Sequence, residues 1–454
     1  MIHSRRIMAV VSVAGASAVL AGITIASSVS TVRVAPVGLI GSVAAIRPVT
    51  IQTRAAEGSP WVGSGSCAAS NCHGSIAPVP GWPILGNEHT TWIGDDPHAR
   101  AFQVLLEPRS ERIARNLAGG GQVIPAHRDP RCLACHSVPR PESFRAGTEW
   151  MDADGVGCEA CHGPARDWLG PHTTEAWRLG QIARPPSFWA TDDLETRVRT
   201  CAGCHIGRHD PSSGLIQDVN HDLIAAGHPR LDFEFAADHD RMPPHWTPRG
   251  IEQSEDFPAR AWLIGQRVGL EEVLSLTVAR ASSPSAPWPE FSEYGCAGCH
   301  HDLTDRTPPI GSAGAYQWAT WHAAGVEAAA AVLGNQGPVA HTLEPLTTHM
   351  NRPVPPRAQA AQTAQAAAQG LAALLQVPPR LDSSTIRHAI AELERPANPR
   401  SPNDHDRQAQ RYLGLVPLYQ TLERQGADPA ELETLRTRLE TMRERLMQTQ
   451  PALP

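Results

Sequence analysis

The ten cysteines constrain this chain more than any other feature, because they form five close pairs and histidine follows each pair. Four pairs read CLACH, CEACH, CAGCH and CAGCH, while the first, CAASNCH, has four residues between its cysteines. Cys-x-x-Cys-His is typical of covalent haem attachment. Two thiols about one helical turn apart can reach the vinyl groups on one porphyrin edge, and the next residue then places an imidazole beneath the iron. The residues concerned are Cys67, Cys72 and His73; Cys132, Cys135 and His136; Cys158, Cys161 and His162; Cys201, Cys204 and His205; and Cys296, Cys299 and His300.

Paired cysteines have two other common uses, a disulfide scaffold in an exported chain and a zinc site. Neither requires histidine after every pair, and only 21 of the 454 residues are histidine. We therefore interpret the four regular motifs as haem sites. The wider Cys67–His73 loop is interpreted as a fifth site, with a local disulfide as its alternative, because every other cysteine lies in a haem motif. The expected cofactor is haem c, five per chain and covalently attached.

Further histidines are candidates for the second axial ligands. Five of the 21 histidines lie in the motifs, which leaves 16. A second ligand closes a haem to small molecules, whereas an open haem is a candidate reaction centre. Because Met151 and Met242 are the only methionines of the haem region, histidine at both axial positions is favoured. The main candidates are His98 in DDPHARAF, His172 ten residues after His162, His221 and His228 seven residues apart, and His245 in MPPHW, followed by His239, His127 and His301.

The composition agrees with an interior filled by cofactors. Hydrophobic residues make up 41% of the chain and aromatic residues only 5%, which is little material for a large side-chain core. Five porphyrins would supply the missing apolar bodies, and folding would then depend on haem insertion. The net charge of −7 gives no basic surface of the kind that binds nucleic acid.

The N-terminus predicts export. Arg5 and Arg6 precede an apolar stretch from about residue 7 to residue 25, so residues 1–30 are a signal peptide or an N-terminal membrane anchor. Covalent haem attachment takes place outside the cytoplasm, which agrees with this assignment. We expect a protein that is periplasmic or membrane-anchored facing the periplasm, with residues 31–65 as a linker.

The motif-bearing region resembles the multihaem cytochrome c-554 family, which carries the cytochrome c-552/4 domain. The resemblance rests on DPHARAF, RCLACH, GVGCEACHGPA, NHDLIAAGHPRL and CAGCHHDL, and covers roughly residues 66–325. It implies a mostly helical fold of low regularity with haems in close contact. It also implies axial roles for His98 and His172 and, in one family member, a haem without a distal ligand. This chain departs from that member in its five motifs and its additional C-terminal region.

The fold class expected is mainly α with long irregular loops, a multihaem cytochrome c domain being followed by a C-terminal helical region. Its parts are a pentahaem domain at 66–330, a linker at 331–356 and helices over 357–454. One long helix is expected at 256–281. A later helix begins at Asp428 as N-cap, with Pro429 in its first turn and Glu431 placed for a capping box. We expect it to pack in a bundle against the haem domain, with a dimerising coiled coil as the alternative.

Three functions fit these features. The favoured one is an electron carrier that passes single electrons between exported redox protein partners, whose identities the sequence does not give. The second is an enzyme in which one haem keeps an open iron for a small nitrogen or sulfur compound, with acid–base groups nearby. The third is a haem-bearing subunit of a membrane redox complex. Membrane association would use the N-terminal segment.

Overall fold

The structure is a computed structural model that describes residues 61–138, 150–210, 215–284, 286–296, 299–300, 317–395 and 405–448. The expected leader or anchor (1–30) lies outside the described residues, as do most of the 31–65 linker and His301. No helix in the described part of the chain is long and apolar enough to cross a membrane.

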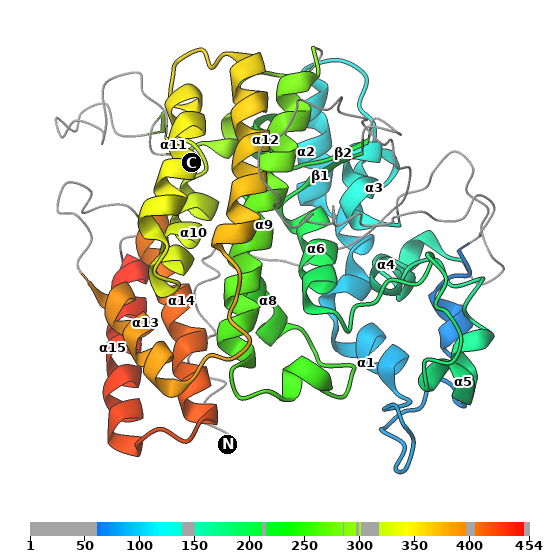
Figure 1. The fold of residues 1–454 in the computed structure, drawn as a ribbon. Helices are drawn as coiled ribbons and strands as arrows, with labels where there is room; N and C mark the ends of the chain where they lie inside the picture. Colours follow the sequence, from blue (N-terminus) through cyan, green and yellow to red (C-terminus); the bar gives the residue numbers. More distant parts are fainter. Residues whose placement is uncertain are drawn as a thin grey trace, which may run out of the picture.

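The motif-bearing region consists of short helices joined by irregular loops, as expected (Figure 1). Polar caps start several of these helices: Asp129 accepts a hydrogen bond from the Arg131 amide, and Asp193 accepts one from the Thr196 amide. One antiparallel hairpin pairs Arg208 with Gln217. The elements are α1 (Glu88–Asp95), α2 (Pro108–Ala118), α3 (Pro130–His136), α4 (Glu159–His162), α5 (Glu175–Arg178), α6 (Leu194–His205), β1 (Arg208–Asp210), β2 (Leu215–Gln217), α7 (His221–Ala225) and α8 (Phe235–Arg241).

Longer helices form a bundle on the other side of the molecule (Figure 1). Helix α9 confirms the long helix expected at 256–281, and it packs against α6, α10, α12 and α14. Nearly every face of α9 is buried, so this helix joins the two parts of the molecule. The bundle elements are α9 (Phe257–Ser282), α10 (Thr320–Val332), α11 (Gln336–Met350), α12 (Arg357–Leu374), α13 (Ser383–Glu394), α14 (His405–Arg424) and α15 (Pro429–Gln448).

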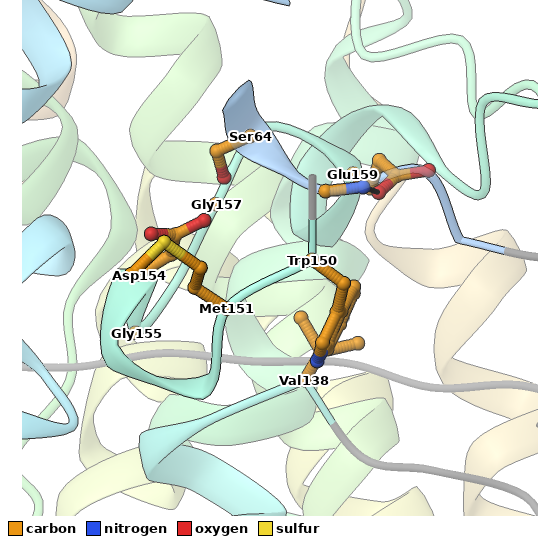
Figure 2. A pocket seen from close by; sticks show the side chains of 9 residues that line it. Ser64, Val138, Trp150, Met151, Asp154, Gly155, Gly157 and Glu159 are labelled. Carbon is orange, nitrogen blue, oxygen red and sulfur yellow. Dashed lines mark hydrogen bonds between the residues drawn. The ribbon is translucent and has the colours of Figure 1, made fainter. Parts of the chain in front are cut away.

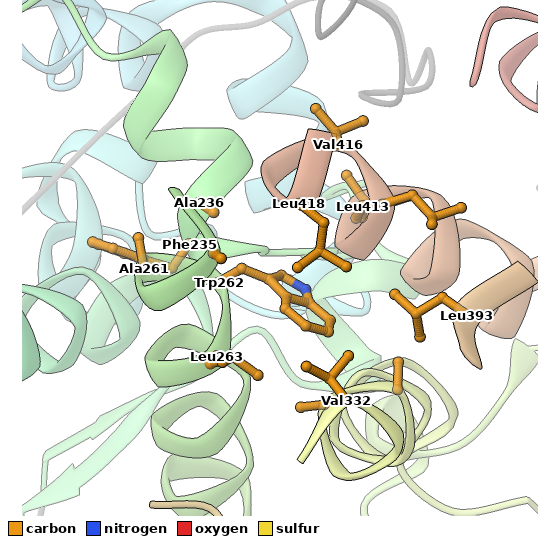
Figure 3. Packing of buried hydrophobic residues seen from close by; sticks show 14 of the residues in the cluster. Phe235, Ala236, Ala261, Trp262, Leu263, Val332, Leu393, Leu413, Val416 and Leu418 are labelled. Atoms are coloured by element: carbon orange, nitrogen blue, oxygen red, sulfur yellow. The ribbon is translucent and has the colours of Figure 1, made fainter. Parts of the chain in front are cut away.

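Trp262 of α9 lies at the centre of the largest hydrophobic cluster (Figure 3). Its side chain is fully buried, with Phe235, Leu393 and Leu418 in the same cluster. Gly414 of α14 allows this approach, since a Cβ there would lie 2.6 Å from Trp262 Cζ2. Side chains from the motif-bearing region, the bundle and the helix between them therefore share one core.

The bundle differs from the sequence expectations over residues 331–356. Residues 331–356, expected to be a linker, include helix α11, whose Val339, Leu343 and Leu346 are buried. Pro338 lies in its first turn, where the missing amide costs little, and Pro345 lies inside the helix. Those prolines gave the segment the composition of a linker.

Helix α15 begins as expected, because Asp428 Oδ1 accepts hydrogen bonds from the amides of Ala430 and Glu431. The Glu431 carboxylate, which was expected to complete a capping box, pairs instead with Arg387 of α13. Leu439 and Leu446 of α15 are buried within the chain's own hydrophobic core, so the apolar side of the helix packs within the bundle, as expected.

Candidate functional site

Three regular motifs end short helices, which gives their residues the geometry that the spacing predicts. Helices α3, α4 and α6 end at His136, His162 and His205 respectively. A turn of helix brings the two cysteines of each motif to one side, with the histidine immediately after them. No disulfide joins the ten cysteines, all of which lie in the described part of the chain.

The wide first motif closes its longer loop with backbone hydrogen bonds. The Cys72 amide donates to Ala69 O at 2.8 Å and the His73 amide donates to Cys67 O at 3.3 Å. Gly74 packs tightly beneath the loop, since a Cβ there would lie 1.8 Å from Ala68 O. The two extra residues are thus accommodated in a turn, and His73 again follows directly after the loop.

Four of the five motif histidines face a second imidazole at nearly one distance. Each second imidazole belongs to one of the histidines proposed from the sequence as distal ligands. The ring centroids are separated by 6.2 Å for His73 and His172, 6.2 Å for His98 and His205, 6.4 Å for His136 and His228, and 6.3 Å for His221 and His300.

This separation fits an iron atom between each pair of rings. A bond between a metal and an imidazole nitrogen is about 2 Å long, and the ring centroid lies roughly 1 Å behind that nitrogen. Two imidazoles on opposite sides of one iron therefore have centroids about 6 Å apart. A direct hydrogen bond between two imidazoles would bring them closer. The residues present fit haem with two histidine ligands.

Backbone carbonyls orient three of these imidazoles through Nδ1. His136 Nδ1 lies 3.1 Å from Ala101 O, His172 Nδ1 lies 2.6 Å from Leu169 O, and His228 Nδ1 lies 2.8 Å from Pro229 O. A carbonyl only accepts hydrogen bonds, so each of these Nδ1 atoms carries the proton. Each Nε2 is therefore left as the free electron-pair donor, as ligation requires.

Carboxylates orient two others. His73 Nδ1 lies 3.0 Å from Glu88 Oε2, and His98 Nδ1 lies 2.9 Å from Asp96 Oδ1. Neither acid was identified from the sequence. The Asp-Pro-His spacing contains a signal for Asp96, since an aspartate before Pro97 is placed to cap the short helix that carries His98. Glu88 lies 15 residues after His73 and gives no comparable local signal.

His162, the histidine of the third motif, is arranged differently from the other four motif histidines. Its Nδ1 lies 3.4 Å from Thr191 Oγ1, and in the part of the chain that the structure describes no imidazole ring contacts it. His245, the remaining distal candidate, is near enough to lower the pKa of His162 by charge repulsion. His245 Nδ1 lies 3.4 Å from Pro243 O, and its ring contacts Trp246. The structure therefore brings four candidate distal histidines opposite motif histidines and leaves His162 and His245 apart.

Burial favours the neutral form of several of these imidazoles by lowering their pKa values. It lowers the pKa of His136 to about 4 and that of His162 to about 4. Burial also lowers the pKa values of His205, His228 and His245. At His73, the hydrogen bond from the ring to Glu88 raises the pKa instead. A neutral imidazole is the form that binds a metal.

The motifs lie close to one another in a definite order. The Cys67 side chain is within hydrogen-bonding reach of Cys158, and the Cys135 side chain is within reach of Cys204. Charge interactions also connect Cys161 with Cys204. The first motif is therefore next to the third, the third next to the fourth, and the fourth next to the second.

Glu159, inside the CEACH motif, is a structural residue that the sequence analysis missed. Its buried carboxylate accepts hydrogen bonds from the amides of Val62, Gly63 and Ala165. These bonds hold the segment before the first motif against the third motif. Beside it lies a small pocket lined by residues including Ser64, Trp150, Asp154 and Glu159 (Figure 2). No histidine lines this pocket.

The weaker distal candidates are placed differently from the four pairs. His239 Nε2 accepts a hydrogen bond from Arg197 Nη1 at 2.9 Å, beside Glu252 and Trp246. His127 lies in the short helix Ala126–Arg128 before α3. For these two, an axial role stays a sequence-based prediction.

Comparison with known proteins supports the haem interpretation. The family model described as cytochrome c554 and c-prime matches residues 67–163. Cytochrome c-554 of Nitrosomonas europaea is 28% identical over 169 residues, which cover 36% of this chain and 65% of that protein. The chain thus spans just under two thirds of the length of this curated relative. No solved structure matches the chain.

The matched segment contains three motifs together with His98, and the match implies covalently bound haem c. Motifs, imidazole geometry and sequence similarity agree, and residues 67–163 resemble a c-type cytochrome of the cytochrome c554 family.

Proposed function

We propose that this chain is an exported pentahaem c-type cytochrome that transfers single electrons between redox protein partners. The observation that carries the proposal is the set of four imidazole pairs with centroids 6.2–6.4 Å apart. In each pair one ring follows a cysteine pair and the other comes from a distant segment. Four independent repeats of one spacing support a shared cofactor geometry better than four unrelated histidine contacts.

The axial ligands follow from these pairs. We assign His73 with His172, His136 with His228, His205 with His98, and His300 with His221. The ten cysteines would attach the haems covalently. Bound haem supplies one-electron chemistry at iron, and two histidine ligands leave that iron without an open position. The side chains described here hold and orient the haems and exclude water.

The proximity of the motifs supports transfer along a series. The first, third, fourth and second motifs follow one another through the cysteine contacts described above. The fifth motif joins the series near the second. Arg230 lies two residues after His228, which faces His136 of the second motif, and the charge of Arg230 interacts with Cys296 of the fifth motif. We propose this order, with the first and fifth motifs at its ends. Cys299 and His300 are exposed, which makes the fifth motif accessible to a partner.

One observation favours a second function, that of an enzyme with an open haem. Among the described residues, no imidazole contacts the His162 ring, so a haem there would keep one position for a small molecule unless His245 moves to bind it. Arg197, His239 and Glu252 lie nearby and could supply proton donors, because Arg197 contacts both other side chains and its charge acts on His162.

Electron paramagnetic resonance of the oxidised protein separates the two functions. A carrier with five closed haems gives only low-spin signals. A high-spin signal that disappears in His162→Ala and changes with nitric oxide or cyanide establishes an open site at the third motif. If the four paired haems also prove high-spin, the axial assignment above is wrong.

A further inference from the structure

Two of the proposed axial ligands differ from the others in the charge of their hydrogen-bond acceptor. His98 Nδ1 lies 2.9 Å from the Asp96 carboxylate, and His73 Nδ1 lies 3.0 Å from the Glu88 carboxylate. The corresponding atoms of His136, His172 and His228 face neutral backbone carbonyls. The five rings therefore have similar hydrogen bonds, but only those of His98 and His73 have a negatively charged acceptor.

Both carboxylates are held in place by the backbone as well as by the imidazole. Asp96 Oδ1 also accepts a hydrogen bond from the His98 amide at 2.9 Å, and Glu88 Oε1 accepts one from the Leu85 amide at 2.9 Å. Each acid is thus fixed against one ring. A carboxylate fixed in this way acts continuously on its imidazole, unlike a mobile surface charge.

We propose that Asp96 and Glu88 are positioning residues that lower the reduction potentials of the haems bound by His205 with His98 and by His73 with His172. The proposal rests on the haem ligation proposed above. A negative acceptor draws the Nδ1 proton toward itself, which makes Nε2 a stronger electron donor and favours ferric over ferrous iron. A neutral carbonyl does this more weakly.

The effect of Asp96 exceeds that of Glu88. The Asp96 side chain is 2% exposed and the Glu88 side chain 16% exposed, so water screens the charge of Asp96 less. Asp96 also faces the charges of His98 and His245, the unpaired candidate. The haem held by His205 and His98 therefore has a lower potential than it would have beside a neutral acceptor, and it is the centre most sensitive to the loss of its acid.

The test uses Asp96→Asn and Glu88→Gln in the full holoprotein, because each substitution removes the charge and keeps one oxygen acceptor. In Asp96→Asn that oxygen can accept from both the ring and the His98 amide, as Asp96 Oδ1 does, whereas in Glu88→Gln it can accept from the ring only, because Glu88 uses its other oxygen for the Leu85 amide. Asp95→Asn is the matched control, since it removes the same charge one residue away at an exposed position. Potentials are measured by optical redox titration. Low-spin signals and haem content are recorded first, and they test the ligation independently of the potentials.

In Asp96→Asn, the reduction potential of one haem rises by about 59 mV. This is a tenfold change in the reduction equilibrium of a one-electron couple. Glu88→Gln raises the potential of a different haem by a smaller amount, and Asp95→Asn moves none comparably. Equal small shifts of all haems in Asp96→Asn and Asp95→Asn would overturn the proposal, as would an unchanged titration in Asp96→Asn. A wild-type protein without low-spin haem would instead overturn the ligation.

Discussion

The motif-bearing region and the helical bundle achieve compactness in different ways. In the bundle and on α9, large clusters of leucine, alanine and aromatic side chains form continuous cores. Between residues 61 and 170 the hydrophobic clusters are small, and the cluster around Leu105 has only three buried members. These segments instead contribute cysteines, and histidines whose rings face a second imidazole at the separation that an intervening iron requires. The bundle is stabilised by side-chain packing, and we expect the motif region to need its cofactors for stability.

The largest expected effect comes from removing one cofactor attachment. Cys158→Ala with Cys161→Ala removes the third motif, which contacts the first motif and lies near the fourth. We expect at most four haems and a strong loss of correctly folded protein, measured by haemochrome content and protease resistance of the motif region. A fully folded variant with normal resistance would contradict the dependence of this region on its cofactors.

Removing side-chain packing affects the other region. Trp262→Ala deletes a fully buried ring from the core shared by α9 and α14, and we expect a loss of about 3–5 kcal/mol in the free energy of unfolding with haem content unchanged. Chemical denaturation followed by far-ultraviolet circular dichroism measures it. Trp82→Ala is the control, because that ring is 39% exposed and its loss has a smaller effect. Equal losses in both variants would remove the distinction between core and surface.

The junction of the two regions has a pH dependence of its own. Glu234, which caps α8 and accepts a hydrogen bond from Gln266 of α9, has its pKa raised to about 7 by burial. The folded protein then holds a proton that the unfolded chain releases near pH 4.5, so stability falls as pH rises from about 4.5 to 7.

Glu234→Gln removes this dependence while keeping an oxygen acceptor at the cap. Its free energy of unfolding relative to wild type rises by up to about 3 kcal/mol between pH 4 and pH 8. Denaturant titrations at the two pH values measure the change. Glu255→Gln, at an exposed site, serves as the control. A constant difference between Glu234→Gln and wild type would show that the Glu234 carboxyl has the same pKa in the folded and unfolded states.

The smallest effect is expected on the bundle surface. Arg387 of α13 and Glu431 of α15 form an exposed bidentate ion pair. Exposed pairs contribute little because water and salt screen them. Arg387→Gln should leave the thermal midpoint and haem content unchanged within error. A clear fall in the midpoint would indicate that the bundle depends on its surface charges.

Local patterns predicted much of this molecule. Short segments predicted α9 and the N-cap of α15. They also singled out the cysteine–histidine motifs and the four histidines that the structure places opposite motif histidines: His98, His172, His221 and His228. Which distal histidine faces which motif was not predictable, because that pairing depends on long-range folding. Asp96 and Glu88 were missed since their roles appear only once the rings are oriented. Helix α11 was missed because its two prolines outweigh its apolar spacing.

The central claim is that all ten cysteines attach five haems. Intact mass spectrometry of the mature protein tests it most directly, with thiol alkylation of the denatured sample as a companion measurement. We predict the polypeptide mass plus five haems and no alkylated cysteine. Fewer than five haem additions, an alkylated cysteine, or cysteines joined to one another would contradict it.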